Sequence, residues 1–136
     1  MKYCAFSSAA LLVCMSALPS AFAGERAQQL VNIDTADRIA YGSTGAARNS
    51  TDAIQSIACE VSAYVGDNKV YSRCYAQDTK GNFADCYSSE PQHAQVAQSV
   101  GPDSWIRFSW QDGGPNGDIC SEILVSNSSI NAIKKP

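Results

Sequence analysis

Cysteine is abundant in this chain, which has six in 136 residues. Two of them, Cys4 and Cys14, lie within the first 23 residues. The others lie between residues 59 and 120: Cys59, Cys74, Cys86 and Cys120. An even number of cysteines in a small exported chain indicates disulfide bonds that support a modest hydrophobic core. The length predicts one folded domain, so we expect a small domain cross-linked by disulfides.

The first 23 residues are typical of a secretory signal peptide. Lys2 supplies a positive charge, residues 9–17 form a short apolar run, and Ala21-Phe22-Ala23 fits the rule of small residues at a cleavage site. The apolar run is shorter than the roughly 20 residues that a membrane-spanning helix needs. We therefore expect cleavage after Ala23, export to the periplasm or to the outside of the cell, and no membrane insertion of the mature chain.

From residue 54 onward the sequence is typical of β-strands. Apolar side chains occupy every second position from 57 to 65, the pattern of a strand with one buried face. Further strands are predicted at 69–77, 83–88, 106–110 and 119–126, separated by turns rich in Gly, Asp and Asn. The first three of these strands are joined by short turns, so we expect them to form an antiparallel meander.

One helix is predicted between the third and fourth strands. Ser88 or Ser89 can cap it, Pro91 suits its first turn, and Gly101-Pro102 ends it. The expected fold is therefore α+β and β-rich. Its antiparallel sheet has about five strands, in the order three strands, one helix, two strands, and the short helix packs on one face of the sheet.

The chain divides into four regions by composition. Residues 1–23 are the signal peptide, and residues 24–52 are expected to form an N-terminal arm or irregular wrap, because small and polar residues dominate their second half. Residues 53–128 are the disulfide-linked β-rich domain, and residues 129–136 are a polar C-terminal tail.

The predicted disulfides are Cys74–Cys86 and Cys59–Cys120. A turn centred near residue 80 places Cys74 almost directly opposite Cys86 on the neighbouring strand. Cross-strand Cβ atoms lie roughly 4.5–5.5 Å apart, which is close to disulfide range. The second bond would join the first strand to the last. Four cysteines allow three pairings, and the rival pairing, Cys59–Cys74 with Cys86–Cys120, stays open.

Composition and motifs argue against several classes of function. The chain has 13 acidic and 10 basic residues and a sequence pI near 4.9, so nucleic acid and anionic membranes are poor partners. No cysteine pair has zinc-ligand spacing and His93 is the only histidine, so we predict no metal and no cofactor. His93 falls on the apolar face of the predicted helix, where packing explains it better than catalysis. The stretch 112–118 is better explained as a hairpin turn than as a calcium loop, and no catalytic residue is assigned.

Aromatic residues and arginine gather on one face of the hairpin made by the second and third strands. These side chains could form a second core against the N-terminal arm or the fourth strand, which is the usual use of aromatics. They could instead form a binding surface, because Tyr, Trp and Arg dominate protein-interface hot spots. Trp105 and Arg107 alternate with Ile106 and Phe108, and we expect them to face outward. The candidate binding surface consists of these residues: Tyr71, Arg73, Tyr75, Tyr87, Trp105 and Arg107.

Three classes of function remain. The first is a small secreted non-catalytic protein that recognises an extracellular protein, and an inhibitor of a secreted hydrolase is one form of it. The second is a carbohydrate-binding module, because the same flat rings can stack on sugars. The third is a small secreted hydrolase that uses carboxylates or His93. The sequence predicts no oligomeric state.

Overall fold

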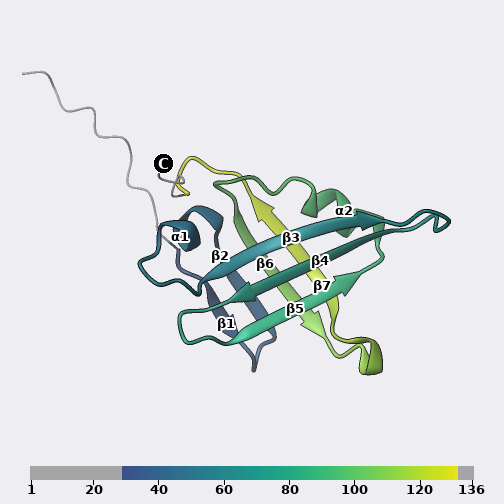
Figure 1. Cartoon of the computed structure of the whole chain (residues 1–136), viewed down its shortest axis with the longest axis horizontal. Helices are drawn as coiled ribbons and strands as arrows, with labels where there is room; N and C mark the ends of the chain where they lie inside the picture. The colour runs from purple at the N-terminus through teal and green to yellow at the C-terminus, as the bar shows by residue number, and fades with distance from the viewer. Residues whose placement is uncertain (1–28, 132–136) are drawn as a thin grey trace, which may run out of the picture.

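The structure is a computed structural model that describes residues 29–131, so the predicted signal peptide lies outside the described residues. Within this range seven strands form one mixed sheet, accompanied by two short helices and a 3-10 turn (Figure 1). In chain order the elements are β1 (Asn32–Asp34), β2 (Ile39–Ser43), α1 (Thr44–Asn49), β3 (Ser56–Ala63), β4 (Val70–Gln77), β5 (Phe83–Ser88), α2 (Pro91–Ala97), β6 (Trp105–Gln111), η1 (Gly114–Asn116) and β7 (Ile119–Ser126).

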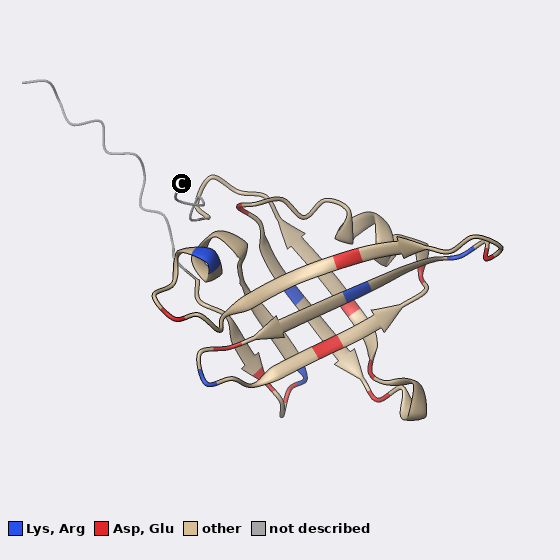
Figure 2. Ribbon diagram, in the orientation of Figure 1, with Lys and Arg blue, Asp and Glu red and all other residues tan. Residues whose placement is uncertain are grey.

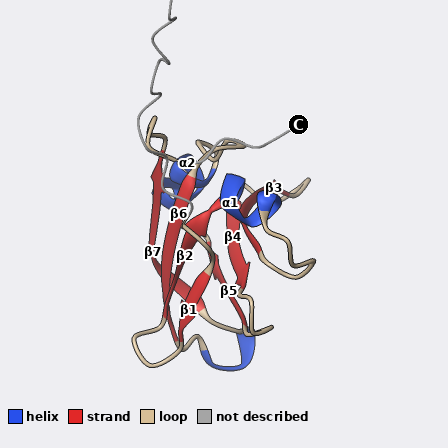
Figure 3. Ribbon diagram, turned by 90° about the vertical axis from the view of Figure 1, so that its left-hand side faces the viewer, coloured by secondary structure: helices blue, strands red, loops and turns tan. Residues whose placement is uncertain are grey.

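The sheet is bent into two layers that face each other. Its strand order is β1-β2-β6-β7-β5-β4-β3. The front layer, β3 to β5, crosses in front of the back layer, β1, β2, β6 and β7, in Figure 1, and the side view in Figure 3 shows the two layers face to face. Neighbouring strands are antiparallel except β5 and β7, which are parallel and aligned at a single residue pair, Tyr87 and Ile119. The two layers are therefore joined by the shortest ladder in the sheet.

The core lies between the layers. Ala40, Ile106 and Phe108 of the back layer are fully buried, as are the front-layer residues Cys74 and Cys86. Small side chains on the inner face of the front layer let the two layers approach closely around Phe108. The helix α2 contacts both β4 and β7. It therefore packs on the inner side of the β4–β5 hairpin, where small side chains allow a helix to approach.

The β-rich prediction is confirmed, but the five-stranded antiparallel sheet is wrong. The strands predicted at 83–88 and 119–126 are β5 and β7, with the predicted bounds. Two further strands, β1 and β2, come from the region expected to be an irregular wrap, and the β5–β7 pairing makes the sheet mixed. The sequence pattern missed β1 and β2 because they are only 3 and 5 residues long and lack a run of large apolar residues.

Close packing explains why β2 contains a glycine. Gly42 in β2 lies against Val31, and a Cβ atom added at Gly42 would come within 2.9 Å of the Val31 Cα atom. At the end of β2, Ser43 caps α1, because its hydroxyl accepts a hydrogen bond from the Ala46 N–H at 3.1 Å. Small and polar residues that suggested a loop therefore form a strand and the start of a helix.

Both disulfides are present, but the predicted pairing is wrong. The bonds are Cys59–Cys74 and Cys86–Cys120, with Cα–Cα distances of 4.0 and 4.9 Å. The predicted register is correct, since Cys74 lies opposite Cys86, but Cys74 also lies opposite Cys59 on its other side. Two strands separate β3 from β7, so a Cys59–Cys120 bond would have to span three strand spacings of about 4.8 Å. That distance exceeds the roughly 7 Å limit for a disulfide, and only the observed pairing joins all four cysteines.

Disulfide bonds of this kind are typical of an oxidising, extracellular compartment. Among residues 29–131, neither helix has the length and apolar character needed to cross a membrane.

Candidate binding groove on the front layer

The outer surface of the front layer is polar and aromatic, because the residues of β3, β4 and β5 alternate between the core and the outside. We call this surface the Tyr–Arg face, which consists of Glu60, Ser62, Tyr64, Tyr71, Arg73, Tyr75, Asp85 and Tyr87. The second core considered for these aromatics is not formed within the described residues, since the exposed fractions of Tyr64 and Tyr87 are 64% and 46%. β2 and β6 pack against the opposite side of this layer, which leaves the Tyr–Arg face accessible.

Arg73 lies at the centre of this face and is held from several sides. Its Nε and Nη2 atoms donate to Asp85 Oδ2 at 3.1 and 2.8 Å. Its guanidinium carbon lies 5.4 Å from the ring centroid of Tyr75 and 5.2 Å from that of Tyr87, within cation–π range. The hydrogen bond to Asp85 raises the pKa of Arg73 further above its usual value. The guanidinium is therefore a fixed cation whose charge is balanced by a neighbouring carboxylate.

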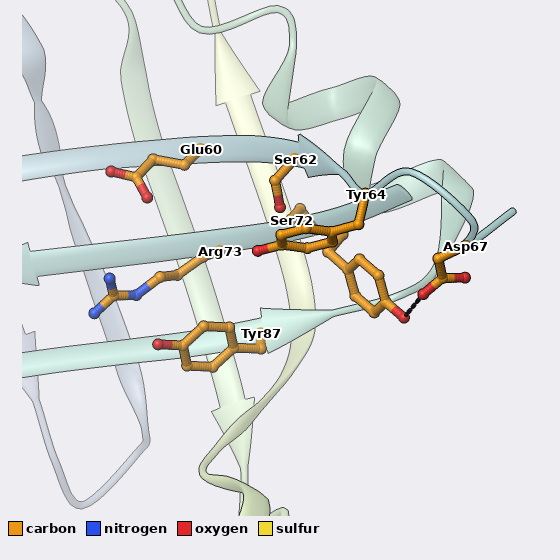
Figure 4. A pocket seen from close by; sticks show the side chains of 8 residues that line it. Glu60, Ser62, Tyr64, Asp67, Ser72, Arg73 and Tyr87 are labelled. Atoms are coloured by element: carbon orange, nitrogen blue, oxygen red, sulfur yellow. Dashed lines mark hydrogen bonds between the residues drawn. The ribbon is translucent and has the colours of Figure 1, made fainter. Parts of the chain in front are cut away.

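An open groove of about 500 Å³ lies between Arg73 and the turn that joins β3 to β4. Figure 4 shows Glu60, Arg73 and Tyr87 on one side of this groove and Tyr64 and Asp67 on the other. The groove is lined by these residues: Glu60, Ser62, Tyr64, Asp67, Tyr71, Ser72, Arg73 and Tyr87. It therefore combines aromatic rings with carboxylates and one guanidinium.

Two tyrosines form the corner of the groove nearest the turn. The ring centroids of Tyr64 and Tyr71 are 5.9 Å apart, and their planes are tilted by 60°. The Tyr71 hydroxyl donates to Asp67 Oδ2 at 2.6 Å, drawn as the dashed line in Figure 4. This hydrogen bond is the main reason that the pKa of Tyr71 is raised above 10.0. Tyr71 is therefore a neutral ring with a fixed orientation.

The β3–β4 turn positions Asp67 at this corner. Gly66 has φ +88°, a left-handed conformation that favours glycine. The Asp67 N–H donates to the Tyr64 carbonyl oxygen at 3.2 Å, and Asp67 Oδ1 accepts from the Lys69 N–H at 3.1 Å. The turn at 66–68 therefore reverses the chain and also places the Asp67 carboxylate next to the Tyr71 hydroxyl.

The structure divides the predicted binding surface into two groups. Tyr71, Arg73, Tyr75 and Tyr87 come together on the Tyr–Arg face, whereas Trp105 and Arg107 lie on the outer side of β6, in the back layer. Trp105 packs against Tyr41, with ring centroids 6.3 Å apart. Arg107 Nη2 lies 3.4 Å from Glu122 Oε2. One compact partner footprint therefore cannot include both groups.

Sequence reasoning missed Glu60, Tyr64 and Asp67 as groove residues. The signal for two of them was present in the alternation of the first predicted strand, which places Glu60 and Tyr64 on the side opposite the apolar residues. What could not be read was the partner strand, since Glu60 becomes informative only when it is known to lie opposite Arg73.

His93 lies near the start of α2 and is half-buried. Its Nδ1 atom is 2.8 Å from Ser88 Oγ, which also accepts a hydrogen bond from the Glu90 N–H at 3.1 Å. This arrangement ties the first turn of the helix to the end of β5, which is a structural role. In the described part of the chain, no group of three or more His, Cys, Asp or Glu residues is placed to hold a metal ion.

The stretch 112–118 contains η1 and joins β6 to β7 as a hairpin connection. Figure 2 shows acidic, basic and acidic segments in turn across β3, β4 and β5 of the front layer. Each of these strands has one charged residue: Glu60, Arg73 and Asp85. Comparison of the chain with protein-family models, with curated proteins and with solved structures gave no match.

Proposed function

We propose that this protein is a small exported binding protein, without catalytic activity, that recognises an extracellular protein through its Tyr–Arg face. The observation that carries this proposal is an accessible cluster of tyrosine rings arranged around a guanidinium that is already held in place. Tyrosine and arginine are enriched among the few residues that carry most of the binding energy in protein interfaces. Because Asp85, Tyr75 and Tyr87 hold Arg73 before binding, little side-chain freedom would be lost when a partner docks.

The expected signal peptide and the two disulfides support an exported location for this role. Cleavage after Ala23 would leave a chain with net charge −4, since the whole chain carries −3 and Lys2 is removed. The destination would be the periplasm or the outside of the cell.

The β3–β4 hairpin supports a partner with a concave surface. In Figure 1 its tip projects beyond the body of the sheet. Val65 at this tip is fully exposed, and Tyr64 beside it is 64% exposed. An exposed valine at the tip, next to an aromatic face, would suit a protein that inserts into a cleft, as an inhibitor of a secreted hydrolase would.

A carbohydrate ligand is the second candidate, favoured by one observation. The exposed ring of Tyr64 lies across the groove from Glu60 and Arg73, so an aromatic platform faces a hydrogen-bonding carboxylate and guanidinium. Sugars combine such stacking with polar contacts. The same variants distinguish the two candidates when they are tested against both proteins and glycans.

The test is partner capture with tyrosine variants on the two layers. We expect Tyr64→Ala and Tyr87→Ala each to weaken binding of the captured partner by about tenfold or more, the range of interface hot spots. The matched control is Tyr41→Ala, which removes a partly exposed tyrosine from the back layer. Thermal unfolding of each variant should change little, because these rings lie at the surface.

Each alternative outcome has a clear meaning. Loss of binding in Tyr41→Ala alone would contradict the proposal. Binding of a defined oligosaccharide that is lost in Tyr64→Ala, without any protein partner, would favour the carbohydrate-binding function instead.

A further inference from the structure

The groove on the Tyr–Arg face has a charge that its own residues do not balance. Arg73 is paired with Asp85, and no ion pair to Glu60 or Asp67 is found within the described residues. Lys69 is the other basic residue nearby, and it lies in the exposed turn. The carboxylates of Glu60, Asp67 and Asp85 therefore outnumber the cations of Lys69 and Arg73.

The aromatic corner has the geometry that attracts a cation. Tyr64 and Tyr71 are 5.9 Å apart with planes tilted by 60°, so a group placed in the corner would meet two rings. The face of an aromatic ring carries negative potential, which binds ammonium and guanidinium groups. The hydrogen bond that Tyr71 donates to Asp67 pushes further electron density into the Tyr71 ring and strengthens this attraction.

The same chemistry already operates inside the protein. The Arg73 guanidinium lies over the rings of Tyr75 and Tyr87 and is neutralised by Asp85. Tyr64, Tyr71 and Asp67 repeat that set of groups on the other side of the groove, but without a cation. The positive charge of Arg73 would oppose a second cation only weakly, because Asp85 balances it.

We propose that the groove takes a lysine or arginine side chain of a basic protein partner, held against the rings of Tyr64 and Tyr71, with the carboxylate of Asp67 beside it and that of Glu60 across the groove. This inference rests on the proposed function and specifies the partner's chemistry. The overall acidity of the chain, with pI near 4.9, would also favour approach by a basic partner, since complementary charge speeds association.

Defined peptides test this proposal without a known partner. Hexalysine and hexaarginine are titrated into the protein, and the ring resonances of its tyrosines are followed by NMR, with hexaglutamate and maltohexaose as comparison ligands. We expect the basic peptides to shift the resonances of Tyr64 and Tyr71, and binding to weaken as NaCl rises, because salt screens exposed charges. Hexaglutamate should cause no such shift.

Charge variants locate the effect. Glu60→Gln should weaken binding of the basic peptides by about threefold to fivefold, the range expected for one exposed ion pair. The control is Glu122→Gln, which removes a half-buried carboxylate paired with Arg107 on the back layer and should leave binding unchanged.

Equal shifts with hexaglutamate, equal weakening in Glu122→Gln, or no shift of Tyr64 and Tyr71 with either basic peptide would overturn the cation site. If the basic peptides fail while Tyr64→Ala still loses the captured partner, the cation site is wrong and the proposed function stands. If Tyr64→Ala and Tyr87→Ala also leave partner capture unchanged, both are wrong. A shift caused by maltohexaose alone would assign the groove to sugars.

Discussion

At the scale of single residues, aspartate side chains hold the turns that border the front layer. Asp78 accepts hydrogen bonds from the N–H groups of Lys80 and Asn82, both at 2.9 Å, and from the Asn82 side chain at 2.8 Å. Asp67 makes a similar local bond and also reaches Tyr71. Such short side chains hydrogen-bond to nearby backbone and so favour turns. At Asp67 the turn residue is also part of the groove.

The link between Asp67 and Tyr71 predicts a pH effect. Because the carboxylate of Asp67 raises the pKa of Tyr71 above 10.0, the Asp67→Asn variant should lower that pKa toward the ordinary value. An NMR titration of the Tyr71 ring carbons measures it, and Tyr41 in the same spectra serves as an internal control.

The raised pKa of Tyr71 also determines the direction in which folding stability changes with pH. A tyrosine whose folded pKa is raised stabilises the fold below the unfolded pKa, and this contribution is lost as the pH rises through the folded pKa. Stability should therefore fall above about pH 10 more steeply in the wild type than in Asp67→Asn. An unchanged Tyr71 pKa in the variant would show that the hydrogen bond does not form in solution.

At the scale of elements, the contact between β5 and β7 determines how the two layers stay together. These strands share one aligned pair, Tyr87 and Ile119, and a hydrogen bond from the Tyr87 N–H to the Asp118 carbonyl oxygen at 3.0 Å. The Cys86–Cys120 disulfide lies beside this pair and links the layers covalently. The Cys59–Cys74 disulfide instead joins β3 to β4, which already share a long antiparallel ladder.

The two disulfides should therefore differ in their effect on stability. The Cys86–Cys120 bond closes a separation of 34 residues, and the Cys59–Cys74 bond closes one of 15. In the chain-entropy model these correspond to roughly 4 and 3 kcal/mol, and the weak pairing at β5–β7 acts in the same direction. We expect the Cys86→Ala/Cys120→Ala variant to lose more free energy of unfolding than Cys59→Ala/Cys74→Ala.

Urea unfolding followed by circular dichroism measures both variants. Each double variant keeps the other disulfide intact, so each is the control for the other. A larger loss in the variant that lacks the Cys59–Cys74 bond would mean that the edge strand, rather than the junction of the layers, limits stability.

At the scale of the whole molecule, folding the sheet into two layers produces two outer faces with separate sets of aromatics. The Tyr–Arg face lies on the front layer, and Tyr41, Trp105 and Arg107 lie on the back layer. The hairpin tip at Val65 extends the front face beyond the sheet (Figure 1). A partner that binds the front face can therefore contact the tip as well, but not Trp105.

This arrangement predicts that the tip contributes to binding without contributing to stability. Val65 is fully exposed, so Val65→Asp should leave the melting temperature unchanged and weaken partner binding by about tenfold, because a charge would enter a desolvated contact. The control is Ile130→Asp, which places the same charge at another exposed apolar position. Unchanged binding in Val65→Asp would mean that the tip lies outside the partner's footprint.

Local patterns were sufficient for several features of the fold. Alternating side chains and turn residues predicted β5 and β7 with the observed bounds, and the turn near residue 80 placed Cys74 opposite Cys86 as observed. Contacts between neighbouring strands depend on period and turn geometry, which are local properties. The alternation of β6 likewise predicted that Ile106 and Phe108 face inward, and both are fully buried.

Features that depend on contacts between distant segments could not be predicted from local sequence patterns. β1 and β2 are too short to give a strand pattern, and they become strands by pairing with each other and with β6. The disulfide pairing depended on the place of β3 next to β4 and far from β7.

The sequence by itself thus determined which residues lie on the same side of each strand, since side chains alternate along any extended chain. Only the tertiary structure decided which of those sides meet. Packing between layers brings together segments that lie far apart in the sequence. As a result, Tyr64, Tyr71 and Tyr87 stay uncovered on the front layer, whereas Trp105 lies on the back layer.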